Sequence, residues 1–259
     1  MSFAFGTLFT RFHAPRMLPD LLTAIDLLHP DLLIHESGEF STPLAGTLRG
    51  VPWAHHSYGI IRPSQIQRLA TEAMLPLWRE FGQPVPANAG VFSNAYIDVC
   101  PPSLQLEQEL PPTRVPMRAA TGPAGPETLP RISSRPLVLV TFGTVFHRAP
   151  GRVADIARAV ARLPVDVLWT SGPGVPPGSL APQPANVQVV EYVPLAQILP
   201  LCAAVVSHGG SGTMLAALAH GVPLVVLPQG ADQFMNAGQV SVSGAGLTAD
   251  TRAGPGVDD

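Results

Sequence analysis

The chain has 259 residues, of which 46% are hydrophobic, enough for one large domain or two smaller ones. Its 15 basic residues are all arginine and are outnumbered by 18 acidic ones, so a formal charge of −3 disfavours non-specific binding to nucleic acid. Cys100 and Cys202 form neither a disulfide framework nor a metal-binding spacing, and a reducing, cytoplasmic location is expected. No apolar run approaches the roughly 20 residues that a membrane-spanning helix needs, so no membrane span is expected.

Helical periodicity alternates with short apolar runs through the first hundred residues. The pattern predicts helices at 17–28, 40–48 and 64–81, and strands at 31–35, 51–57 and 93–100. Alternation of this kind is typical of a parallel α/β sheet.

The alternation is interrupted at residues 111–135, which are rich in proline and glycine and lack periodicity. We interpret this segment as a linker between a first domain at 1–110 and a second at 136–259. In the second domain the pattern predicts strands at 137–142, 165–170, 187–190, 205–207 and 222–227, with helices at 151–162, 195–199 and 212–220. That order favours a doubly wound sheet.

The turn before the helix at 212–220 carries the most chemical information. It reads His-Gly-Gly-Ser-Gly-Thr from His208 to Thr213 and follows a buried strand. Glycines let a ligand approach the backbone, and the free N–H groups of a helix start attract anions, so the turn is a candidate phosphate site. Taken alone, such a turn could equally be a tight strand-to-helix connection.

The surrounding residues resemble the donor-binding signature of GT-B nucleotide-sugar-dependent glycosyltransferases, of the natural-product and antibiotic type found in actinobacteria. The matching pieces, in chain order, are YVP at 192–194, HGGSGT at 208–213 and GVPLVVLP at 221–228. Asp232 and Gln233 follow, with Asn236 three residues after Gln233. VTFGT at 140–144 also matches, and PDLLIHE, GVPWAHHS and CPPSLQ match more loosely. The resemblance implies two Rossmann-like domains, the first an acceptor-binding domain that is incomplete here and the second a donor-binding domain without its C-terminal helices.

Individual roles follow from the same resemblance. His208 resembles the residue that binds the donor's α-phosphate, and Gly210, Ser211, Gly212 and Thr213 resemble its diphosphate ligands. Asp232 and Gln233 match residues that contact the sugar, Tyr192 and Val193 match residues that contact the base, and Thr144 matches a first-loop donor contact. Tyr192 could instead be a core residue, and Asp232 a solvated turn residue or a helix N-cap. Ala216 stands where many relatives have a glutamate that holds the ribose, which leaves UDP and dTDP as alternatives.

The residue that removes the acceptor proton has no clear counterpart. Glu36 falls near the acid that orients this general base in relatives, and His13, His29, His55 and His56 are available as substitutes. If none of them substitutes, the chain is a non-catalytic nucleotide-sugar-binding fragment or auxiliary subunit, and a partner chain or oligomer could cover the incomplete first domain.

The expected reaction is an inverting transfer of a sugar from a UDP- or dTDP-sugar to a hydroxyl of a small lipophilic acceptor. Neither a metal nor another cofactor is expected, because the sequence contains no Asp-x-Asp motif to hold a cation against a diphosphate. An NAD-dependent oxidoreductase is disfavoured because the GxGxxG spacing is absent. A related sugar-nucleotide enzyme on the same fold, such as an epimerase or a cell-wall precursor transferase, is the closer alternative.

Overall fold

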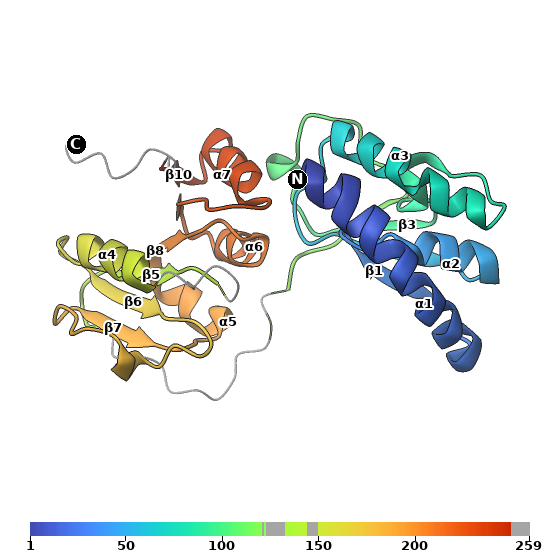
Figure 1. Cartoon of the computed structure of the whole chain (residues 1–259). Coiled ribbons are helices and arrows are strands. Elements are labelled where there is room, and N and C mark those ends of the chain that lie inside the picture. Colours follow the sequence, from blue (N-terminus) through green and yellow to red (C-terminus); the bar gives the residue numbers. More distant parts are fainter. Residues whose placement is uncertain (121, 123–132, 144–149, 250–259) are drawn as a thin grey trace. The chain divides into compact units, whose positions relative to one another are not determined.

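The computed structural model describes residues 1–120, 122, 133–143 and 150–249 (Figure 1). The chain divides into two compact units, Met1–Arg118 and Ala119–Asp259. Each unit contains one sheet, and every strand pair in both sheets is parallel. The predicted α/β class is therefore confirmed. In the described part of the chain, no helix is long and apolar enough to cross a membrane.

The first unit is built on a four-stranded sheet with the order β1-β2-β3-β4. Its elements in chain order are the π-helix η1 (Ala4–His13), α1 (Ala14–Leu28), β1 (Leu33–Glu36), α2 (Ser41–Arg49), β2 (Trp53–His56), α3 (Ser64–Glu80), the 3-10 helix η2 (Ala87–Gly90), β3 (Ala95–Asp98), the 3-10 helix η3 (Pro102–Leu104) and β4 (Arg114–Pro116). Because each new strand is added on the same side, the right-handed crossover rule puts α2 and α3 on one face of the sheet. Strand β4 lies within the segment predicted as a linker, and its pairing with β3 makes it part of the first unit.

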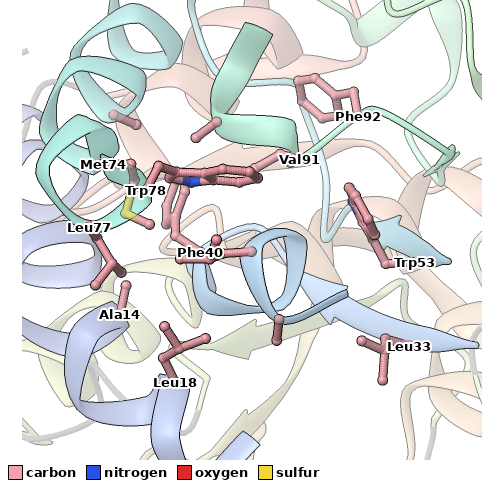
Figure 2. Packing of buried hydrophobic residues seen from close by; sticks show 14 of the residues in the cluster. Ala14, Leu18, Leu33, Phe40, Trp53, Met74, Leu77, Trp78, Val91 and Phe92 are labelled. Atoms are coloured by element: carbon pink, nitrogen blue, oxygen red, sulfur yellow. The ribbon is translucent and has the colours of Figure 1, made fainter. Parts of the chain in front are cut away.

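The core of the first unit forms where the helices pack on β1 and β2 (Figure 2). Trp78 of α3 and Phe40, just before α2, are each 1% exposed, and Trp53 of β2 is 7% exposed. Helix α2 can approach β2 because residue 46 is glycine: a Cβ there would lie 2.6 Å from the carbonyl oxygen of Val51. These aromatic side chains fill the core.

The second unit is built on a six-stranded sheet with the order β10-β9-β8-β5-β6-β7. Its elements in chain order are β5 (Leu137–Thr141), α4 (Pro150–Val160), β6 (Asp166–Thr170), the 3-10 helix η4 (Pro177–Ser179), β7 (Val187–Val190), α5 (Leu195–Ile198), the 3-10 helix η5 (Leu199–Leu201), β8 (Cys202–Ser207), α6 (Ser211–Ala219), β9 (Leu224–Val226), α7 (Gln233–Val242) and β10 (Gly246–Thr248). All five residues of β5 are buried, and Trp169 of β6 is 1% exposed. A central parallel strand covered on both faces explains the unbroken apolar run.

The order of this sheet determines where a ligand can bind. From β5 the chain adds β6 and β7 on one side, then returns to add β8, β9 and β10 on the other. The winding direction thus reverses between β5 and β8, which are neighbours in the sheet. In doubly wound sheets, ligands bind outside the carboxyl ends of the strands at such a reversal.

Candidate functional site

A cavity of about 260 Å³ lies at the carboxyl ends of the strands in the second unit. Its walls come from the last residues of β5 and β6 and from residues that follow β5, β6, β7 and β8: Thr141, Gly143, Thr170, Gly172, Pro173, Glu191, Tyr192, Val193, Leu195, Gly212 and Thr213. Four of the predicted donor contacts, Tyr192, Val193, Gly212 and Thr213, are therefore brought together. The cavity lies where the reversal between β5 and β8 predicts a binding site.

Tyr192 and Val193 play different parts in this wall. Val193 is 7% exposed and packs into the core, whereas Tyr192 is 63% exposed. The alternative interpretation of Tyr192 as a core residue is wrong, since its ring is open to solvent. Thr144, predicted as a first-loop contact, lies outside the residues that the structure describes.

His208 follows the last residue of β8 and is 7% exposed. Two glycines make room for its ring. A Cβ on Gly143 would lie 2.8 Å from Cε1 of His208, and a Cβ on Gly210 would lie 2.6 Å from its Nε2. His208 therefore lies directly behind Gly143 in the cavity wall, between the turns that follow β5 and β8.

The protonation of His208 is set by opposing influences. Burial lowers its pKa, while the negative charge of Asp232 and a hydrogen bond with the backbone of Thr141 raise it again. The net shift is downward, which favours the neutral ring. A phosphate bound nearby would favour the charged ring and raise the pKa.

The amide groups at the start of α6 complete the turn. Gly210 has an extended conformation at the N-cap position, and the first helical hydrogen bond runs from the N–H of Met214 to the carbonyl of Gly210. The backbone N–H groups of Ser211, Gly212 and Thr213 therefore have no partner within the helix. They and the positive end of the helix dipole are suited to an anion.

The side chain of Ser211 has a hydrogen-bond partner at the start of α7. Its hydroxyl donates to Oδ2 of Asp232 at 2.8 Å, across 21 residues of sequence. A hydroxyl has one proton to donate, so this contact leaves the backbone N–H of Ser211 as its donor toward a phosphate.

Asp232 and Gln233 stand at the start of α7 but do not line the cavity. Asp232 occupies the N-cap position of α7, as the N-cap alternative predicts, although its side chain makes no capping hydrogen bond. Gln233 is 2% exposed, and its Oε1 accepts from the backbone N–H groups of Gln229 and Gly230 at 2.8 and 3.0 Å. Its carbonyl oxygen therefore holds the loop before α7.

The candidates for the general base, and for the acid that orients it, all lie in the first unit. Glu36 ends β1 and is exposed, and its carboxylate accepts from the N–H of Gly38 at 2.8 Å. His55 is 2% exposed and lies 3.2 Å from the hydroxyl of Ser37, while His56 is exposed beside Glu36 in the strand register. Burial, together with the charge of Arg62, lowers the pKa of His55 to about 2, which makes it a poor general base.

The structure also identifies polar residues to which the sequence assigned no role. Asn236 is completely buried and donates to Gly209, Ser211 and Asp232. No helix was predicted at 233–242 from the sequence, so no signal indicated that Asn236 and Asp232 share one face there, as positions i and i+4 of a helix do. On the cavity wall, Oγ1 of Thr170 donates to Oγ1 of Thr141 at 2.7 Å. No group of His, Cys, Asp or Glu within the described ranges is arranged to hold a metal ion.

The sequence matches the N-terminal domain of the erythromycin biosynthesis protein CIII-like family over residues 2–143 and its C-terminal domain over residues 159–254. The chain belongs to this family. Similar CIII-like relatives include L-demethylnoviosyl transferase of Streptomyces niveus, 37% identical over 90% of the chain, and elloramycin glycosyltransferase ElmGT of Streptomyces olivaceus, 32% identical over 90%. The chain spans 62% and 61% of the length of these two relatives.

Solved structures agree with this assignment. The glycosyltransferase VinC in complex with dTDP matches this CIII-like chain with a TM-score of 0.78 and 25% identity, over 96% of the chain and 67% of VinC. The spinosyn rhamnosyltransferase SpnG in complex with thymidine diphosphate matches with a TM-score of 0.80 and 26% identity, over 94% of the chain and 66% of SpnG. The predicted GT-B fold is confirmed.

Proposed function

We propose that the chain takes part in the inverting, metal-independent transfer of a sugar from a nucleoside diphosphate to a hydroxyl of a small lipophilic natural product. The second unit binds the nucleotide sugar, and the first unit contributes to the acceptor site. The observation that carries the proposal is the cavity at the β5–β8 reversal, with His208 and the start of α6 beside it. The names of the relatives, an L-demethylnoviosyl transferase and an elloramycin glycosyltransferase, support it.

The chemistry of the site suits departure of a diphosphate. Glycosyl transfer has an oxocarbenium-like transition state, in which negative charge accumulates on the leaving group. The N–H groups of Ser211, Gly212 and Thr213 and a proton on His208 would stabilise that charge. These groups supply the positive charge that a metal ion supplies in other transferases, so activity is expected to persist in the presence of a chelator.

We propose dTDP as the preferred nucleotide. Ala216 of α6 is apolar and 6% exposed, and it offers no hydrogen-bond acceptor to a ribose 2′-hydroxyl. A deoxyribose lacks that hydroxyl and loses nothing at this position. The complexes of VinC and SpnG with thymidine diphosphate are consistent with this preference.

Calorimetric titration of the purified chain with dTDP and UDP tests the donor site. His208→Ala is expected to weaken dTDP binding at least tenfold, about 1.4 kcal/mol, because the imidazole no longer assists the helix amides. His220→Ala is the matched control, because this exposed histidine caps the opposite end of the same helix and is expected to leave binding unchanged. A folded wild-type chain that binds neither nucleotide would contradict the proposal.

A second function, nucleotide-sugar binding without transfer, is favoured by the state of His55. The most buried histidine in the first unit has a pKa too low for a general base, and no other base has been assigned. Release of dTDP from a dTDP-sugar on addition of phenolic or macrolide acceptors would establish transfer. Saturable dTDP binding, with no release above the rate of spontaneous hydrolysis for any acceptor, would establish the binding function instead.

A further inference from the structure

Asn236 lies one helical turn into α7 and is completely buried. Its side-chain Nδ2 lies 2.8 Å from the carbonyl oxygen of Gly209, 2.9 Å from Oδ2 of Asp232 and 3.1 Å from Oγ of Ser211. The Ser211 hydroxyl donates in turn to the same Oδ2 of Asp232. One amide therefore joins the glycine turn before α6 to the carboxylate at the start of α7.

The orientation of this amide is determined by its surroundings. Turning it over would place Oδ1 against the carbonyl of Gly209 and the carboxylate of Asp232, three acceptors with no proton between them. In the observed orientation Oδ1 is buried with no hydrogen-bond partner. An unsatisfied buried oxygen costs free energy that an apolar side chain of similar size would avoid. The two N–H groups are therefore the reason for an amide at this position.

The contacts on Asp232 also determine how its carboxylate is oriented. Both hydrogen bonds, from Ser211 and from Asn236, are made to Oδ2. The carboxylate is half-buried, so the bonds hold it in one rotamer and leave Oδ1 to accept from a ligand hydroxyl.

We propose that Asn236 is a positioning residue that couples the sugar end of the donor to its phosphate end. It fixes the carboxylate of Asp232, which the resemblance assigns to the sugar, and, through Gly209, the turn that carries His208 and the amides at the start of α6. The proposal rests on the proposed function, with the diphosphate bound at the turn and, as the resemblance implies, the sugar at Asp232. It predicts that loss of the Asn236 amide weakens binding of a nucleotide sugar more than binding of the nucleoside diphosphate without its sugar.

The test is calorimetric titration of the full chain with dTDP-glucose and with dTDP. Asn236→Ala is expected to weaken dTDP-glucose binding about tenfold and dTDP binding by a smaller factor. Asn186→Ala is the matched control in the same unit: its side-chain amide donates to the carbonyls of Ala161 and Val165 at 2.9 and 3.0 Å, and neither of these lines the cavity. The control is expected to lower the unfolding temperature without changing either affinity.

Asn236→Asp keeps the shape of the side chain and adds a readout that a purely structural role would not change. In this variant two carboxylates would lie within hydrogen-bond distance of each other. Repulsion between their negative charges raises the pKa of one of them. Above that pKa they repel and Asp232 turns away; below it a shared proton restores the contact. The affinity of this variant for dTDP-glucose, relative to dTDP, is expected to recover several-fold between pH 8 and pH 5.5, beyond any change in the wild type.

The outcomes separate the two proposals. Equal weakening of both ligands by Asn236→Ala, or wild-type affinity in either folded variant at pH 8, would overturn the positioning role while leaving the donor site in place. If Asn236→Ala does not fold, the pH response of Asn236→Asp decides, and its absence counts against the role. A folded wild-type chain that binds neither ligand would overturn the proposed function, and this inference with it.

Discussion

The imidazole of His208 lies between Gly143 and Gly210. Only Gly143 has a backbone conformation that favours glycine. Gly143 has a φ of +66°, a conformation that other residues rarely adopt. Gly210 has φ −62° and ψ 137°, which any residue can adopt. The need for glycine at position 210 therefore comes from the ring, 2.6 Å from where a Cβ would stand.

Gly210→Ala is expected to displace the imidazole and weaken dTDP binding at least fivefold, with a lower unfolding temperature because alanine is also a poor N-cap. Gly238→Ala is the matched control in α7, where a Cβ would meet no atom within 4 Å. That change is expected to stabilise the chain by about 1 kcal/mol through helix propensity and to leave binding unchanged. Calorimetry measures the dTDP affinity of both variants, and thermal unfolding measures their stability. Wild-type affinity in Gly210→Ala would show that the position of the His208 ring does not matter for dTDP binding.

At the scale of elements, the pairing of β1 with β2 brings two histidine rings into contact. His35 lies opposite His55 in the register, with ring centroids 4.9 Å apart. The ring of His55 also stacks on Tyr96 and meets Phe92 edge-on. Burial lowers the pKa of both histidines, for His55 to about 2, and the charge of Arg62 adds to the effect.

This pair makes stability depend on pH. The unfolded chain binds a proton at His55 near pH 6.5, whereas the folded chain does so only near pH 2. Between these values the unfolded state holds more protons, so the free energy of unfolding falls as pH falls, by up to about 1.4 kcal/mol per pH unit for His55 alone.

Urea unfolding at pH 7.5, 6.5 and 5.5 measures this slope. His55→Gln is expected to flatten it, while His220→Gln, at an exposed position, is expected to leave it unchanged. A wild-type chain whose stability is constant across this range would contradict the buried neutral state of His55.

The elements themselves differ in how far the sequence could predict them. The strands β5 and β8 and the turn into α6 were predicted, because unbroken apolar runs followed by glycine turns are local signals. Strand β4 was missed, since it has three residues and ends in Pro116, and an edge strand tolerates proline. In β2, alternation could not tell which histidine points inward, because Trp53, Ala54 and His55 are all buried.

At the scale of the whole molecule, the site depends on contacts that no local pattern encodes. The sequence predicted the strand ends, but only the sheet order shows that the winding reverses between β5 and β8. Ser211 and Asp232 are 21 residues apart in the sequence, and they meet because α6 packs on α7. The sequence of the turn alone therefore could not predict the hydrogen bond between their side chains. The predicted roles of His208, Asp232 and the α6 amides stay predictions that ligand binding must test.

Hydrogen–deuterium exchange of the full chain with and without dTDP tests the location of the donor site most directly. Protection is expected in the segments that line the cavity, at 170–175, 191–195 and 207–215, and at the start of α7, because bound phosphate engages the α6 amides and damps local opening. Residues 1–118 are expected to exchange as they do without ligand. Protection confined to the first unit, or no protection at saturating dTDP, would contradict the assignment of this site.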